Sequence, residues 1–295
     1  MDTLQKTYSS FSSGLGDHDL DKLLRNTDAV MAGPVTKLLA QGGIDSLRTE
    51  PFHLLDNACG TGALVAQLQR IVGSDVLGKS KILCGDINQP HLDILQRRMS
   101  KNGWVNTEAA TIDAQDSKLP PSSFSHVTIS LGLHVIPQPD LVLKDTIRIL
   151  QPGGVLAFST MSKDNTGWVP DVRSAFETLP FDTAMPDPLP MTTNGQAEWA
   201  DPGRIEQKLA EHGFQDIRVE TIQHIQHIES AEHFTELFAM MISWMVNTYW
   251  TSEQKEEYQG SLKKRVDEHL REKYAGKGWD LTWTMILATC RTRQD

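Results

Sequence analysis

The sequence has few cysteines and no long apolar run. Only 3 of its 295 residues are cysteine, and an odd number cannot all pair, so we exclude a disulfide framework and expect a reducing compartment. The longest apolar stretches, such as residues 238–246, are far shorter than the ~20 residues that a membrane span needs. Residues 1–13 lack the cationic start and apolar stretch of a secretory signal. These absences predict a cytoplasmic protein without a membrane partner.

Positive charge is also scarce. The chain has 28 Lys and Arg residues against 38 Asp and Glu residues, which gives a net charge of −10. Such a chain repels polyphosphates, so we expect no nucleic-acid partner. The rest of the composition, with 39% hydrophobic residues, 21 Gly and 14 Pro, is that of an ordinary globular protein.

Short apolar segments alternate with amphipathic segments through the first half of the chain. Strands are expected at 53–57, 81–86, 107–112, 127–131 and 154–160, with helices between them and one helix at 18–41 before the first strand. Such alternation implies right-handed crossovers and a mostly parallel sheet that is covered on both faces. The predicted fold class is α/β, doubly wound.

The pattern changes after the fifth strand. Residues 168–202 are rich in Pro, Asp and Thr and are expected to form a long loop. A helix at 201–212, a strand at 217–225 and a last strand at 281–289 follow, and a helical insertion at 231–274 separates the two strands. We therefore expect an N-terminal helical cap over 1–52 and one domain over 53–295, with the insertion at about 231–275 forming a lid.

A glycine turn follows the first expected strand. In the segment from Asp56 to Gly62, Gly60 and Gly62 allow the backbone to turn tightly and to approach a ligand. Asp86 ends the second strand, where a carboxylate can accept hydrogen bonds from both hydroxyls of a ribose. A dinucleotide fingerprint would need a third glycine where Val65 stands, which disfavours a nicotinamide oxidoreductase.

The string Leu54-Leu55-Asp56-Asn57-Ala58-Cys59-Gly60-Thr61-Gly62 resembles the first motif of class I S-adenosylmethionine-dependent methyltransferases. The resemblance implies a seven-stranded sheet and S-adenosyl-L-methionine as the cofactor. It also implies that the Asp56 carboxylate and the backbone of the turn hold the amino-acid end of that cofactor. Ala58 departs from the family pattern, which often has glycine there.

Later segments continue the resemblance. Asp86 is similar to the ribose-binding acid of the family, Asp113 to the acid that accepts from the adenine amino group, and residues 131–134 to a segment that lines the cofactor. Asp113 has an alternative role as a helix cap. The cofactor-binding residues implied by the resemblance are Asp56, Asn57, Ala58, Gly60, Gly62, Asp86, Ile87, Asp113, Ala114 and Leu131.

Less common strings, among them residues 103–106 and 249–254, resemble fungal thiol methyltransferases that cap reduced gliotoxin-type dithiols, and related enzymes of fungal secondary metabolism. This resemblance implies a small-molecule acceptor and favours methylation of a thiol. Alternatives are methylation of oxygen or nitrogen, and a non-catalytic regulatory protein that binds the cofactor. The likeness is weak over residues 166–200, where acceptor contacts are expected. The sequence does not indicate an oligomeric state.

His134 is the candidate catalytic base, because it follows the fourth strand at the edge where ligands bind. A thiol with a pKa of about 8.5 ionises readily, so a base is required only for an alcohol or an amine. His224 and His227 differ by three positions and point to opposite faces of a strand, so we expect no metal site. By resemblance, Tyr8 and Met31 close over the cofactor.

The acceptor is expected to meet apolar side chains of the later segments. The candidate substrate-binding residues are His134, Trp168, Met241, Trp244 and Met245. Methionine adapts to irregular ligands, and a dry pocket favours a reaction that disperses charge. The alternative is that the members at helical spacing are core residues.

Overall fold

The computed structural model describes residues 7 and 16–294, which form two compact units. The sheet unit comprises Leu24–Lys163, Met191–Ile222 and the described part of Met285–Asp295. The helical unit comprises the described part of Met1–Leu23 together with Asp164–Pro190 and Gln223–Thr284. The predicted division between residues 52 and 53 stays a prediction.

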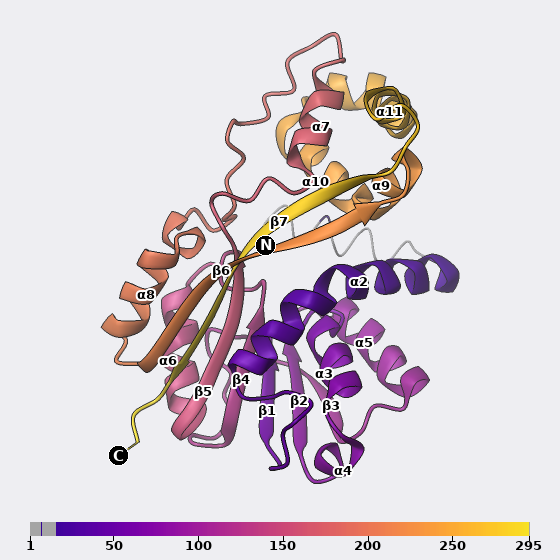
Figure 1. The fold of residues 1–295 in the computed structure, drawn as a ribbon. Coiled ribbons are helices and arrows are strands. Elements are labelled where there is room, and N and C mark those ends of the chain that lie inside the picture. Colours follow the sequence, from indigo (N-terminus) through magenta and orange to yellow (C-terminus); the bar gives the residue numbers. More distant parts are fainter. Residues whose placement is uncertain (1–6, 8–15, 295) are drawn as a thin grey trace. The chain divides into compact units, whose positions relative to one another are not determined.

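One sheet of seven strands organises the sheet unit (Figure 1). Its order is β3-β2-β1-β4-β5-β7-β6. The pairs β1/β2, β1/β4, β2/β3 and β4/β5 are parallel, whereas β7 pairs antiparallel with β5. The strands are β1 (His53–Asn57), β2 (Lys81–Asp86), β3 (Thr107–Thr111), β4 (Phe124–Ser130), β5 (Leu150–Met161), β6 (Gln215–Ile228) and β7 (Trp279–Arg291). This topology confirms the predicted fold class, and parts of β6 and β7 belong to each unit.

Helices cover both faces of this sheet (Figure 1). Successive side chains of a strand point to opposite faces, so Leu54 and Leu55 of β1 belong to two different cores. One core contains side chains of α2 (Asp17–Gln41), α3 (Ala63–Ile71), α4 (Ser74–Leu77) and α5 (Gln89–Asn102). The other contains side chains of α6 (Pro139–Ile149), the 3₁₀ helix η1 (Ala197–Ala200) and α8 (Pro202–Glu211). The sheet is therefore buried on both faces. This packing holds the ends of its strands in fixed positions.

Residues that favour helix ends set the bounds of the helix that follows β2. The Asn88 side chain accepts a hydrogen bond from the His91 N–H at the start of α5. Gly103 ends the helix at φ 59°, a conformation that glycine adopts without strain. The N-cap of α5 therefore stands two residues after Asp86, and the helix begins at the next residue.

Four helices make up most of the helical unit: α7 (Val169–Phe176), α9 (Ala231–Leu237), α10 (Ala239–Tyr249) and α11 (Ser252–Lys273). The predicted helical insertion is thus confirmed, but the long loop expected over 168–202 is wrong in part, because it contains α7 and η1. Pro170 stands in the first turn of α7, where its missing N–H costs nothing, and Val172 and Phe176 bury one face. No helix within the described residues is long and apolar enough to cross a bilayer.

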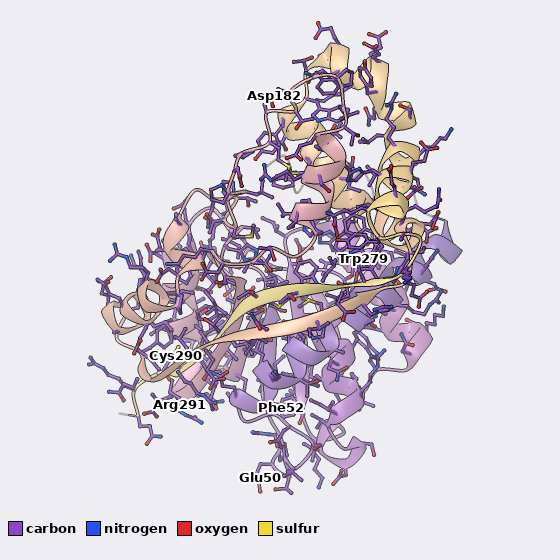
Figure 2. The ribbon with its side chains drawn as sticks, turned by 45° about the horizontal axis from the view of Figure 1, so that its top comes forward. Glu50, Phe52, Asp182, Trp279, Cys290 and Arg291 are labelled. Atoms are coloured by element: carbon purple, nitrogen blue, oxygen red, sulfur yellow. The ribbon has the colours of Figure 1, made fainter. Side chains whose placement is uncertain are left out.

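A buried carboxylate joins three segments of the helical unit. Asp171 on α7 is only 2% exposed and accepts hydrogen bonds from Lys273 Nζ at 2.8 Å, Tyr274 OH at 2.7 Å and Trp279 Nε1 at 2.9 Å. The Tyr274 and Trp279 rings stack with centroids 4.1 Å apart, and Trp279 is labelled in Figure 2. Burial and the bond to Asp171 raise the pKa of Tyr274, so the phenol stays a donor. Asp171 therefore ties α7 to α11 and to the start of β7.

Replacing this carboxylate should loosen the helical unit. We expect Asp171→Ala to lower the free energy of unfolding of the helical unit by about 3 kcal/mol. The reason is that the Lys273, Tyr274 and Trp279 donors lose their shared buried acceptor. Urea titration followed by amide hydrogen exchange of α11 measures the change. Glu177→Ala, an exposed position at the end of α7, is the matched control. Equal protection of α11 in the two variants would contradict this role of Asp171.

Candidate cofactor site

The glycine turn lies where β1 ends beside β2. Gly62 N–H donates to the Cys59 carbonyl at 2.9 Å, and Ala58, Gly60 and Gly62 all have positive φ angles, of 58°, 54° and 82°. A Cβ on Gly60 would meet nothing within 4 Å, so the space beside it is open. A Cβ on Gly62 would lie 2.5 Å from Leu95 Cδ1. Gly60 thus leaves room for a ligand, whereas Gly62 leaves room for α5.

Asp86 connects the end of β2 to this turn. Its Oδ2 accepts from the Gly60 N–H at 2.8 Å, and its Oδ1 accepts from the Asn88 N–H at 2.8 Å. His91 Nδ1 lies 3.7 Å from Oδ1. Burial opposes ionisation of Asp86, but the neighbouring His91 and the hydrogen bonds from the Asn88 and Gly60 N–H groups outweigh it and lower the pKa of Asp86. Each carboxylate oxygen accepts more than one bond, so the charged side chain keeps capacity for ligand hydroxyls.

Asp56 and Asn57 end β1 with polar atoms that lack partners. Asp56 is 1% exposed; its Oδ1 accepts from Thr128 Oγ1 at 2.9 Å, and its Oδ2 has no partner. Both side-chain polar atoms of Asn57 are also buried without partners. Burial raises the pKa of Asp56 to about 7, Asp86 adds to this, and the Thr128 bond opposes it. Such orphaned groups are costly unless a ligand satisfies them.

The remaining predicted cofactor residues lie in three different environments. Ile87 is 56% exposed, which is unusual for a large apolar side chain directly after Asp86. Asp113 Oδ1 accepts from the Gln115 N–H at 2.9 Å and from Gln115 Nε2 at 3.2 Å, so it fixes its own loop. Ala114 is buried in a core of the sheet unit, and Leu131 is half-buried with a φ of 55°. Their cofactor contacts stay predictions.

His134 is 8% exposed in the segment that follows β4. Burial lowers its pKa to about 4, and its Nδ1 has no hydrogen-bond partner. The Thr193 N–H donates to the His134 carbonyl at 3.0 Å, and Asn194 Nδ2 donates to the carbonyls of Leu133 and Ile136 at 3.0 and 2.9 Å. Imidazole is therefore neutral here near pH 7.

Sequence reasoning missed several residues that support these groups. Thr128 bonds Asp56, and Thr193 and Asn194 fix the segment that carries His134. Thr128 could have been found only from the register that pairs it with Asp56 across β1 and β4. Thr193 and Asn194 fall in the segment expected to be a loop, and their residue types gave no signal beyond a turn.

The other predicted substrate-binding residues belong to the helical unit. Trp168 is 5% exposed and stacks on Phe238 with centroids 6.2 Å apart, Trp244 is 7% exposed, and Met245 is fully buried. Met241 is half-buried on α10. These positions are what core packing requires, and their substrate-binding role stays a prediction.

The remaining expectations concern the N-terminal segment and metal ions. Tyr8 lies outside the described residues, whereas Met31 on α2 is buried in a core of the sheet unit. Across residues 7 and 16–294, no group of three His, Cys, Asp or Glu side chains could hold a metal ion.

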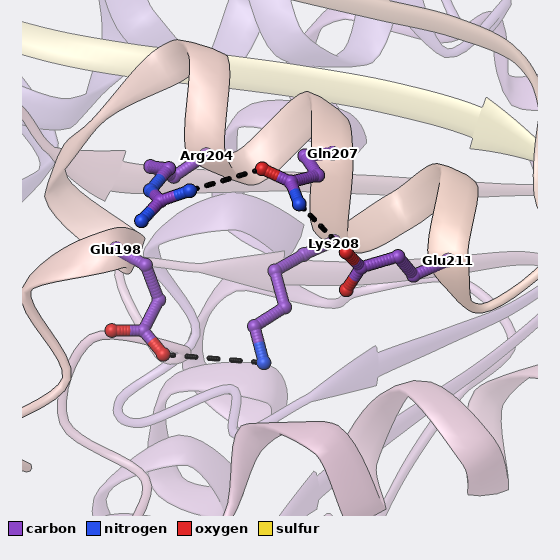
Figure 3. A pocket seen from close by; sticks show the side chains of 5 residues that line it. All are labelled: Glu198, Arg204, Gln207, Lys208 and Glu211. Atoms are coloured by element: carbon purple, nitrogen blue, oxygen red, sulfur yellow. Dashed lines mark hydrogen bonds and ion pairs between the residues drawn. The ribbon is translucent and has the colours of Figure 1, made fainter.

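A hollow of about 230 Å³ lies against α8 (Figure 3). It is lined by Glu198, Arg204, Gln207, Lys208 and Glu211, and contains none of the predicted site residues. Its polar groups bond one another or their neighbours: Lys208 Nζ lies 3.1 Å from Asp140 Oδ2.

The family of this chain is shown by its similarity to known proteins. Residues 43–195, which include the glycine turn, Asp86 and His134, match the model of the ubiE/COQ5 methyltransferase family. The chain belongs to this family. It is a methyltransferase, and its cofactor is S-adenosyl-L-methionine. The nicotinamide and regulatory alternatives are thereby set aside.

Similar proteins cover most of the chain. Methyltransferase tpcH of Aspergillus fumigatus is 28% identical over 82% of this chain and 84% of its own. The acetylaranotin bis-thiomethyltransferase of Aspergillus terreus is 29% identical over 89% of this chain and 90% of its own.

Solved structures share the fold. Phosphoethanolamine N-methyltransferase 2 of Haemonchus contortus, in complex with S-adenosyl-L-methionine, has a TM-score of 0.51 at 15% identity, over 89% of this chain and 53% of that one. The [4+2]-cyclase SpnF has a TM-score of 0.51 at 16% identity, over 90% and 82%. Since a cyclase shares this fold, the fold does not by itself specify the reaction.

Removing the Asp86 charge should weaken cofactor binding. We expect Asp86→Asn to lose about 1.5 to 3 kcal/mol of affinity for S-adenosylhomocysteine, because the ribose hydroxyls and the Gly60 N–H lose a charged acceptor. Calorimetry measures the affinity, with Asp93→Asn on the exposed side of α5 as the matched control. Unchanged affinity in a folded Asp86→Asn protein would remove the assignment.

Binding should also displace a proton from Asp56. Its pKa of about 7 without ligand means that most molecules carry this proton at about pH 6, and a ligand ammonium beside it stabilises the charged form. Binding of S-adenosylhomocysteine should then release close to one proton near pH 6, and affinity should weaken as pH falls below about 7. Calorimetry in buffers of different ionisation enthalpy counts the protons. Asp56→Asn should abolish the release, and a wild-type protein that binds without releasing protons would contradict the contact.

Proposed function

We propose that this enzyme transfers a methyl group from S-adenosyl-L-methionine to the sulfur of a small secondary metabolite. The observation that carries the proposal is the similarity to the acetylaranotin bis-thiomethyltransferase, which extends over 89% of this chain. Methylation of oxygen or nitrogen is the alternative.

The residues at the ends of β1 and β2 fit the proposed cofactor. Asp56 Oδ2 is a buried acceptor without a partner, which suits the ammonium of the methionine moiety. Asp86 is held ionised, which suits the ribose hydroxyls, and the open space beside Gly60 allows close approach of the backbone. Exposed Ile87 offers an apolar surface to the adenine.

When bound, S-adenosyl-L-methionine supplies a methyl group on a positively charged sulfur. The protein then has to hold an acceptor lone pair in line with that methyl and to exclude water. Asp56, Asp86 and the backbone at Gly60 bind and orient the methyl donor.

His134 supports sulfur as the acceptor. A buried imidazole with a pKa of about 4 is a weak base and cannot readily take the proton of an alcohol. A thiol loses its proton to solvent without help, because its pKa is about 8.5. Neutral His134 is therefore suited to orienting an acceptor through its unpartnered Nδ1.

An acceptor panel tests this proposal. With labelled cofactor, we expect turnover of small dithiols at a rate that follows thiolate ionisation, and a loss of less than about tenfold in His134→Ala. Exposed His227→Ala is the matched control. Turnover of phenols or amines but not thiols, with a loss of about a hundredfold in His134→Ala, would replace sulfur by oxygen or nitrogen.

A further inference from the structure

Arg98 supports the glycine turn from within the sheet unit. It lies on α5 and is 6% exposed, which is rare for arginine unless its charge is paired. Its Nη1 donates to the Thr61 carbonyl at 3.0 Å, and its Nη2 bonds Asp28 Oδ2. Thr61 stands between Gly60 and Gly62, so this guanidinium holds the backbone of the turn directly.

The packing around Arg98 belongs to the same support. Its guanidinium carbon lies 5.3 Å from the centroid of the Trp104 ring, and that ring would lie 3.3 Å from a Cβ on Gly62. Leu95, one helical turn before Arg98, fills the remaining space behind Gly62. The turn therefore rests on α5, and Arg98 adds a hydrogen bond to that packing.

Asp28 holds the Arg98 guanidinium in place through an ion pair. It lies on α2, is 9% exposed, and also receives Arg70 Nη2 of α3 at 3.4 Å. A buried carboxylate and guanidinium neutralise each other, and the planar fork of arginine can bond Asp28 and Thr61 together. The chain of contacts runs from α2 through α5 to the turn.

We propose that Arg98 is a positioning residue for cofactor binding, and that Asp28 holds it in place. The inference rests on the proposal that the glycine turn holds the cofactor. Gly60 and Gly62 both have positive φ angles, and the turn does not keep one conformation unaided because glycine has few steric limits. Fixing the Thr61 carbonyl keeps the Gly60 N–H on Asp86 and keeps the turn ready for the ligand.

Arg98→Lys separates positioning from charge. Lysine keeps the positive charge beside Asp28 but lacks the fork that reaches Thr61. We expect the dissociation constant of S-adenosylhomocysteine to rise about tenfold, the KM for the cofactor to rise in parallel, and kcat at saturating cofactor to stay within about twofold. Asp28→Asn should show the same pattern more weakly, and it carries the test if Arg98→Lys does not fold.

Two controls isolate the effect. Arg97→Lys makes the same change at the exposed neighbouring position of α5 and should leave affinity unchanged. Ile205→Val removes a methyl group from the core on the other face of the sheet, so it lowers stability without touching the turn. Unchanged affinity in folded Arg98→Lys, or an equal loss in Ile205→Val, would overturn the proposal.

Gly60→Val distinguishes this proposal from the one on which it rests. Abolished binding in Gly60→Val together with the Arg98→Lys loss supports both. Abolished binding in Gly60→Val with normal binding in Arg98→Lys overturns only the positioning role. Normal binding in folded Gly60→Val would remove the turn from the cofactor site, and with it the role of Arg98.

Discussion

The site depends on one interaction, the hydrogen bond from the Gly60 N–H to the Asp86 carboxylate. It joins the turn after β1 to the end of β2, the two neighbouring parallel strands whose register places Asn57 beside Gly85. Parallel strands bring their carboxyl ends to one edge, but the loops that leave them still need to be held together. Here the Asp86 carboxylate does this, and the N-cap of α5, Asn88, stands two residues further on.

Two acids of adjacent strands lie in opposite electrostatic conditions. Asp86 receives backbone N–H bonds that keep it ionised, whereas Asp56 has one hydroxyl partner and one orphaned oxygen, so burial raises its pKa to about 7. The difference arises from hydrogen bonding, because both side chains are largely buried. Asp86 bonds the backbone of the fold through both of its oxygens, whereas one oxygen of Asp56 has no partner.

Much of this could be predicted from the sequence, because the signals were local. The strand at 81–86 has its predicted bounds, and the glycine turn and Asp86 lie side by side as the motif implied. Helix α7 was missed because the Pro-rich composition around it resembles a loop, although its own apolar spacing is helical. Thr128 lies 72 residues from Asp56 along the chain, Arg98 lies 37 residues from Thr61, and Asp28 lies 70 residues from Arg98. Only strand register and helix packing bring such distant positions together.

The ends of β1 and β2 have a consequence for turnover. In the proposed function, Asp56 binds the ammonium and Asp86 binds the ribose of the cofactor, and both groups are common to the methyl donor and its demethylated product. Contacts of this kind bind the two equally and do not lower the barrier to methyl transfer. If these two acids bind the cofactor as proposed, this half of the site holds the demethylated product about as firmly as the donor, and product inhibition follows. Discrimination between the two must come from groups that sense the positive charge of the sulfonium.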